Sequence, residues 1–157
     1  MIEAVESWVD ALRQELRRHG EMLRLLDHQR QFIKVRPLEE VLRAVATLET
    51  QSATIKTARA HREKCQREFA RLAQQPDDAG FSILIPLVQP EYRPLVKALV
   101  NENKELLFQV RHRAGGNRLL LKRAMKMMQD LLDSLPPTRE TAAVDGNDVT
   151  RAGLWRP

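Results

Sequence analysis

Apolar residues recur along this chain at alternating spacings of three and four, in three stretches that contain no proline. This spacing places apolar side chains on one face of an α-helix and is typical of the seam of a helical bundle or coiled coil. Seven of nine positions are apolar in the first seam: Val5, Val9, Leu12, Leu16, His19, Leu23, Leu26, Arg30 and Ile33. The pattern predicts one long helix that ends near residue 36.

The second and third stretches carry the same pattern. Pro37, followed by Glu39 and Glu40, suits the first turn of a helix, where negative charge is favourable. The second seam, which runs to about residue 74, consists of Leu38, Val41, Val45, Leu48, Ser52, Ile55, Ala58, Arg62, Cys65, Phe69 and Leu72. The third consists of Val96, Leu99, Asn103, Leu106, Val110, Arg113, Asn117, Leu120, Ala124, Met127 and Leu131. Three long helices are therefore expected.

Two adjacent glycines, Gly115 and Gly116, interrupt the third stretch without changing its spacing. Two interior glycines cost a helix about 2 kcal/mol relative to alanine. Because glycine often ends helices, a helix–turn–helix break at this point is the alternative. The unbroken register leads us to predict one continuous helix with a weak point.

Two segments lack a helical seam. The segment from Pro76 to Pro94 contains an apolar run interrupted by Pro86, and we expect it to plug one end of the bundle. Residues 138–157 have no sustained periodicity, and we expect disorder there. The predicted fold class is all-α: an elongated antiparallel three-helix bundle or coiled coil over residues 1–135, with a short apolar connector and a disordered C-terminal tail over residues 136–157.

The amino-acid composition limits the fold class and the cellular compartment that we expect for this protein. Of the 157 residues 43% are hydrophobic but only 4% are aromatic, which argues against an all-β fold. The net charge of +5 is spread thinly, without a polybasic arm. A single cysteine, Cys65, cannot form an internal disulfide and fits a reducing compartment. The acidic N-terminus does not resemble a signal peptide, and no stretch is long enough to cross a bilayer, so we expect a cytoplasmic protein.

The sequence contains few residues in patterns that would support catalysis or the binding of a metal or cofactor. His61 and Cys65 share one helical face, but structural zinc needs four ligands and no companion pair appears. His19 lies within the first seam, where a hydrogen-bonded or partly exposed imidazole is expected rather than a catalytic one. No phosphate-binding glycine loop is present. We expect no enzyme activity, no metal and no cofactor.

Three features of the third helix each allow two interpretations. Asparagine within a seam fixes helix register at a cost in stability, although partial exposure would also explain Asn103, Arg113 and Asn117. Met125, Met127 and Met128 could adapt to varied partner surfaces or simply fill gaps. The basic residues could neutralise nucleic-acid phosphates or form a solvated face; they are Arg111, His112, Arg113, Arg118, Lys122, Arg123 and Lys126.

Several sequence features follow one another in a characteristic order over residues 5–135. A helix starts at Leu38-Glu39-Glu40, a turn with two prolines spans residues 89–95, and the last helix continues from Asn117 through Leu120 and Leu121. Its closing leucines are Leu131, Leu132 and Leu135. This arrangement resembles the FlgN family of flagellar type III export chaperones. The tail sequence Val144-Asp145-Gly146 is similar to a degraded form of the family's tyrosine-to-glycine motif and lacks the tyrosine.

The resemblance implies a cytoplasmic chaperone, without catalysis or a small-molecule substrate, that holds hook-associated proteins of the hook–filament junction and delivers them to the type III export apparatus. An amphipathic client helix could fill a groove between seams, and the tail could fold onto the client. We hypothesise that the client contacts Asn117, Leu120, Leu121, Met128, Leu131, Leu132, Leu135, Val144 and Trp155.

Two other functions remain open at this stage. A structural coiled-coil adaptor would use the same seams for self-association into a homo-oligomer. A basic helical nucleic-acid binder would show salt-sensitive retention on DNA or RNA. Client identity, stoichiometry, oligomeric state and the seam face that meets the client are not determined by the sequence.

Overall fold

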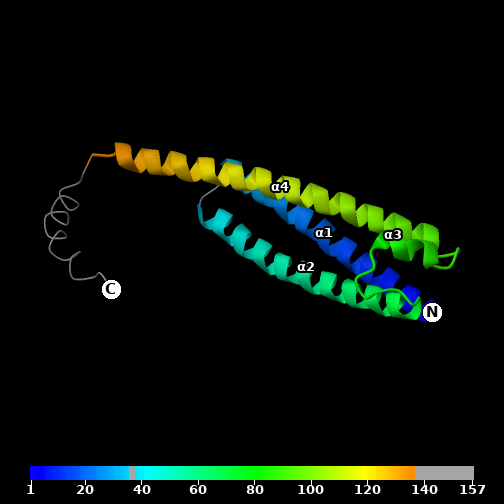
Figure 1. The fold of residues 1–157 in the computed structure, drawn as a ribbon. Helices are drawn as coiled ribbons and strands as arrows, with labels where there is room; N and C mark the ends of the chain where they lie inside the picture. Colours follow the sequence, from blue (N-terminus) through cyan, green and yellow to red (C-terminus); the bar gives the residue numbers. More distant parts are fainter. Residues whose placement is uncertain (36–37, 137–157) are drawn as a thin grey trace, which may run out of the picture. The chain divides into compact units, whose positions relative to one another are not determined.

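The computed structural model describes residues 1–35 and 38–136, and all regular elements in that part of the chain are helical. The three long helices are α1 (Ile2–Val35), α2 (Leu38–Leu72) and α4 (Arg93–Ser134). The connector forms a short helix α3 (Phe81–Leu84) and a 3-10 turn η1 (Ile85–Leu87) (Figure 1). The predicted all-α class, three long helices and short connector are confirmed. The prediction for residues 138–157 lies outside the described residues.

The chain divides into two units, Met1–Leu121 and Lys122–Pro157. The first unit contains α1, α2 and the connector, and the boundary falls within α4. None of the helices in the described ranges is long and apolar enough to span a membrane.

Side-chain hydrogen bonds define how the long helices run in the first unit. Gln51 of α2 donates to the carbonyl of Arg18 at 3.0 Å, and Arg62 donates to Glu15 at 2.8 Å. Later residues of α2 thus meet earlier residues of α1, so these helices are antiparallel. Helix α4 is parallel to α1, because two of its asparagines each bond to the α1 residue 91 positions earlier. The predicted antiparallel bundle is therefore an up-down-up arrangement (Figure 1).

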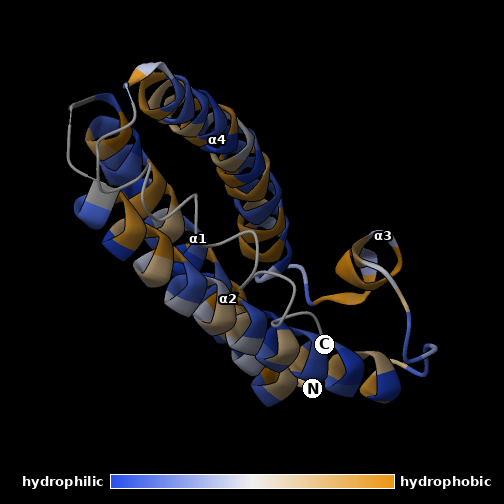
Figure 2. Cartoon of the chain, turned by 90° about the vertical axis from the view of Figure 1, so that its left-hand side faces the viewer, coloured by the Kyte–Doolittle hydropathy of each residue, from blue (hydrophilic) through white to orange (hydrophobic). Residues whose placement is uncertain are grey.

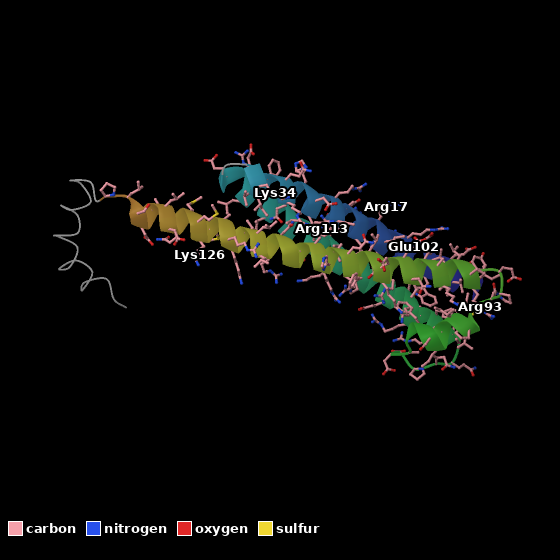
Figure 3. All side chains as sticks on the ribbon, turned by 90° about the horizontal axis from the view of Figure 1, so that it is seen from above. Arg17, Lys34, Arg93, Glu102, Arg113 and Lys126 are labelled. Atoms are coloured by element: carbon pink, nitrogen blue, oxygen red, sulfur yellow. The ribbon has the colours of Figure 1, made fainter. Side chains whose placement is uncertain are left out.

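The two seam asparagines are packing residues rather than exposed interruptions. Asn103 and Asn117 are buried, and their amide nitrogens donate to the carbonyls of Leu12 at 3.1 Å and Leu26 at 2.8 Å. A shift of α4 along α1 would leave these buried amides unpaired, which is costly. The structure therefore favours the register-fixing interpretation for both. Arg113, labelled in Figure 3, is partly exposed and forms an ion pair with Asp27 of α1 at 2.9 Å.

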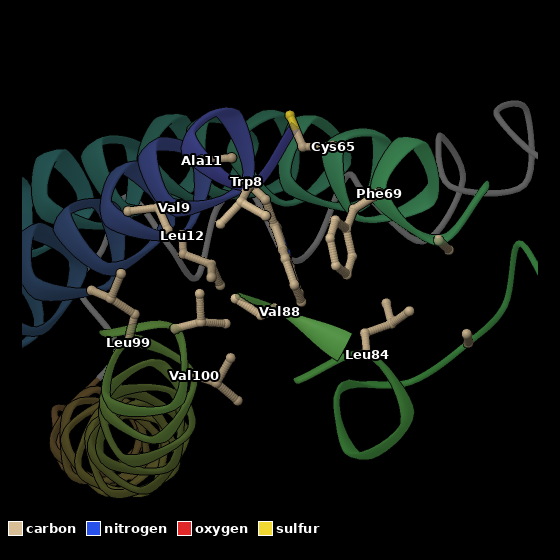
Figure 4. Packing of buried hydrophobic residues seen from close by; sticks show 14 residues of the cluster. Trp8, Val9, Ala11, Leu12, Cys65, Phe69, Leu84, Val88, Leu99 and Val100 are labelled. Carbon is tan, nitrogen blue, oxygen red and sulfur yellow. The ribbon is translucent and has the colours of Figure 1, made fainter. Parts of the chain in front are cut away.

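The core at the connector end is built around Trp8, which is fully buried. Its ring stacks on Phe69 of α2 with centroids 5.4 Å apart, and on Phe81 of α3 with centroids 6.1 Å apart. Leu84 and Val88 from the connector join the same cluster (Figure 4). The expectation that the connector plugs one end of the bundle is confirmed, because its apolar run closes the core over Trp8.

Helix α2 ends in a Schellman turn that uses glutamine where glycine is usual. The amide of Gln75 donates to the carbonyl of Ala70 at 2.8 Å, and that of Gln74 donates to Arg71 at 3.1 Å. Gln74 has a φ of 56°, in the left-handed region. Side chains with a Cβ are strained in this region, whereas glycine is not.

We expect Gln74→Gly to raise the free energy of unfolding by about 0.5 to 1 kcal/mol, because relief of strain exceeds the added entropy of the unfolded chain. Urea denaturation followed by circular dichroism measures the change. Gln14→Gly, at an exposed position inside α1, is the matched control and should destabilise by about 0.7 kcal/mol. A loss of stability in Gln74→Gly would contradict the strain argument.

Helix α4 continues through Gly115 and Gly116, as predicted from the seam. A Cβ placed on either glycine would meet no atom within 4 Å, and neither glycine has a positive φ. Nothing in the described residues therefore requires glycine at these positions.

The double variant Gly115→Ala/Gly116→Ala is expected to raise the free energy of unfolding by about 1 to 2 kcal/mol, since alanine is the best helix former. Thermal and urea unfolding both report this change. A destabilised double variant would indicate that the chain needs a bend at the two glycines, and would contradict a straight continuation of the helix.

Candidate functional site

Large apolar side chains are exposed along the C-terminal part of α4, and their exposed fractions lie between 45% and 67%. We call this set the α4 stripe; it consists of Met125, Met127, Met128, Leu131, Leu132 and Leu135. The first five lie within α4, and Leu135 directly follows it. All six belong to the second unit. Helix α4 carries both hydrophobic and hydrophilic residues (Figure 2).

The spacing of the α4 stripe puts its members on one side of the helix. With about 100° of rotation per residue, they cover about 160° of the circumference. The remaining arc carries the polar side chains Lys122, Arg123, Lys126, Gln129, Asp130, Asp133 and Ser134. This end of α4 is therefore strongly amphipathic, and its polar face is exposed and carries three basic residues followed by two acidic ones.

Two stripe residues are seam positions that the sequence would assign to a core. Met127 and Leu131 continue the spacing of Val110 and Asn117, which are buried. Met127 and Leu131 are 67% and 66% exposed. The same helical pattern thus forms packing in the first unit and an exposed apolar face in the second.

The hypothesised client-binding residues fall into four groups. Met128, Leu131, Leu132 and Leu135 are exposed, whereas Leu120 and Leu121 are half-buried. Asn117 is buried, and its amide is occupied by Leu26 and Gln29 of α1, so the structure gives it a packing role. Val144 and Trp155 lie outside the described residues. Met125 and Met127 are not among the hypothesised contacts, although Met125 lies about 20° from Leu132 and Met127 about 40° from Leu131 around the helix.

The histidine and cysteine pair offers no metal site in the described ranges. His61 Nε2 lies 3.9 Å from Cys65 Sγ, and no third potential ligand completes a cluster in that part of the chain. Cys65 is buried, and this burial raises the pKa of its thiol. The reactive thiolate form is therefore disfavoured.

The sequence profile of one protein family, described as FlgN protein, matches residues 1–144. The match covers α1, α2, the connector and the whole of α4. The chain belongs to the FlgN family. FlgN proteins are cytoplasmic, non-enzymatic chaperones that bind flagellar hook-associated proteins for export. Neither the comparison with curated proteins nor that with solved structures found a match.

Membership in the FlgN family makes the α4 stripe the natural candidate site for a protein client. Soluble monomers rarely expose contiguous apolar surfaces of this kind unless a partner covers them. Leucine supplies apolar area, and flexible methionine side chains adapt to partner surfaces of different shape. The site contains no group suited to covalent chemistry, so its chemistry is burial of apolar surface.

Proposed function

We propose that this FlgN protein captures its hook-associated client on the α4 stripe. The observation that carries the proposal is six exposed large apolar side chains on one side of a helix within residues 125–135. Full burial of one leucine or methionine side chain contributes about 1.5 to 3 kcal/mol. Covering several of them would provide useful affinity even after the cost of association.

The stripe suits an amphipathic helix or an apolar groove of the client. An apolar arc with a charged opposite face is the usual geometry of helix-in-groove recognition. Leu120 and Leu121, which are also hypothesised client contacts, are half-buried and belong to the first unit. A client bound mainly by burial of apolar surface makes few directional bonds and no covalent bond. It could therefore be released to components of the export apparatus by simple dissociation.

Binding of a purified hook-associated protein tests this proposal directly. Titration calorimetry of the full chain should show a saturable complex with a negative heat-capacity change, which marks burial of apolar surface. Sedimentation of the free protein distinguishes client binding from self-association through the same stripe. Failure of every hook-associated protein from the same flagellar system to bind would contradict the proposal.

The tail is the second expected source of client contacts. Trp155 and Val144 are apolar residues of a segment without sustained apolar periodicity, and tryptophan is enriched among binding hot spots. We expect deletion of residues 138–157 to weaken client affinity about tenfold, equivalent to about 1.4 kcal/mol. The same titration measures this loss. A truncated protein that binds as tightly as the full chain would leave the α4 stripe as the client site.

A further inference from the structure

A charged cleft of about 240 Å³ lies in the first unit, among α1, α2, α3 and α4. Its lining includes the apolar residues Phe81 and Leu107 and the buried polar residues His19 and Asn103. Its charged side chains are Glu15, Arg59, Arg62, Glu63, Lys104 and Arg111. None of these residues belongs to the α4 stripe, so the cleft is independent of the proposed client site.

His19 and Asn103 line this cleft with buried polar atoms that lack close partners. His19 is only 1% exposed, and apart from a weak hydrogen bond with the side chain of Asn103 its ring nitrogens have no partner within 3.5 Å. The amide nitrogen of Asn103 donates to the carbonyls of Leu12 and Leu99, while its Oδ1 has no other partner. Because buried polar atoms are nearly always paired, the ring nitrogen of His19 that does not bond to Asn103 is available to a bound molecule.

The charges around the cleft favour an anion. Glu15 is already neutralised, since Arg62 Nε lies 2.8 Å from its carboxylate and Arg59 Nε lies 3.8 Å away. Glu63 lies 4.0 Å from Arg62. Lys104 and Arg111, on α4, have no carboxylate within ion-pair distance in the described ranges. Four cationic side chains against two carboxylates leave two positive charges in excess.

The position of Lys104 is partly set by an aromatic contact. Its amine lies 5.9 Å from the ring centroid of Phe81, and the guanidinium of Arg62 lies 5.4 Å from the same centroid. Phe81 itself stacks on the buried Trp8. Cation–π attraction to the Phe81 ring, which is itself packed on Trp8, therefore keeps the charged groups of Lys104 and Arg62 close to the cleft.

We propose that this cleft binds a small oxyanion, carboxylate or phosphate, while His19 takes up a proton from solvent. One ring N–H of the imidazolium then donates to the oxyanion and the other to Asn103 Oδ1, so that all three buried polar atoms are satisfied. Lys104 and Arg111 balance the charge of the ligand. The oxyanion can come from a free ion or from an acidic side chain of a bound polypeptide.

Proton uptake gives the site a defined pH dependence. In the free protein the pKa of His19 is lowered, first because burial removes the imidazolium from water, and further by Arg59 and Arg62. The negative charge of Glu15 and the hydrogen bond between His19 and the side chain of Asn103 raise this pKa, but burial outweighs them. A bound anion favours the imidazolium and raises this pKa. Affinity should therefore increase as the pH falls, by at most about tenfold per pH unit for one proton.

Nuclear magnetic resonance of the imidazole protons tests the site in the full-length protein. The chain has four histidines, and His19→Gln assigns the relevant signal while His28→Gln serves as control. Sodium acetate is the first probe because it remains ionised between about pH 7.5 and pH 6. We expect a saturable shift of the His19 signal and tighter binding at the lower pH. A shift reproduced by sodium chloride at equal ionic strength, or no saturation, would overturn the proposal.

Variants that remove the same charge at two places on α4 distinguish binding in the cleft from general electrostatic attraction of anions to the protein. Lys104→Gln/Arg111→Gln should weaken acetate binding at least about fivefold, whereas Lys97→Gln/Arg118→Gln removes the same charge elsewhere on α4 and should change it less than about twofold. His19→Gln should bind acetate without pH dependence. An equal loss of acetate affinity in the two double variants would contradict the proposed site. Acetate binding by the wild-type protein that does not depend on pH would contradict it as well.

Two further probes distinguish the source of the oxyanion. Inorganic phosphate represents a free ion, and the capped peptide Gly-Glu-Gly represents an acidic segment, with Gly-Gln-Gly as its uncharged control. Either phosphate or the glutamate peptide should displace acetate from the cleft. Displacement by the glutamine peptide as well, or by neither phosphate nor the glutamate peptide, would overturn the oxyanion assignment. Since no residue is shared, Leu131→Ala/Leu132→Ala should leave acetate binding unchanged even if client binding fails.

Discussion

The double variant Leu131→Ala/Leu132→Ala is expected to bind a hook-associated client roughly 30- to 900-fold more weakly than the wild-type chain. Each leucine is more than half exposed in the free protein, at 66% and 59%. Loss of one leucine side chain from a buried contact costs about 1 to 2 kcal/mol, so two cost about 2 to 4 kcal/mol. Titration calorimetry with the purified client measures the loss.

Stability should be nearly unaffected by the same two substitutions. Surface changes that break no packing usually alter the free energy of unfolding by less than about 0.5 kcal/mol. Leu42→Ala/Leu72→Ala is the matched control, because both leucines are similarly exposed but lie on α2. Unchanged client affinity in Leu131→Ala/Leu132→Ala, or an equal loss in the control, would remove these leucines from the binding site.

Trp8→Ala is expected to lower the free energy of unfolding by about 3 to 5 kcal/mol. Trp8 is fully buried and stacks on two aromatic rings, one from α2 and one from the connector. Its removal would open a cavity where the connector closes the core. Since natural domains are stable by only about 5 to 15 kcal/mol, this is a large share of the total.

Urea denaturation of the full chain measures this effect. Phe108→Ala is the control, because Phe108 is an aromatic residue of α4 that is 67% exposed. It should change the free energy of unfolding by less than about 0.5 kcal/mol. A Trp8→Ala protein as stable as the wild type would contradict the assignment of Trp8 to the centre of this core.

The spacing of apolar residues alone determined most of the local architecture. It predicted a first helix that ends near residue 36, close to the observed end of α1 at Val35, and one helix that continues through Gly115 and Gly116. Seam residues such as Val9 and Val110 are buried as predicted. These features follow from the sequence because a helix is made by neighbours three and four residues apart, which the sequence shows directly.

Only the tertiary structure decided which parts of each seam are covered. Val110 and Leu131 occupy equivalent positions in the third seam, but one is buried and the other is 66% exposed. The amides of Asn103 and Asn117 meet α1 carbonyls 91 residues away, and the cleft at His19 gathers side chains from four elements. Helical periodicity is the same for a core face and a docking face, because burial depends on whether another element reaches that face. The contacts that decide it join residues far apart in the chain.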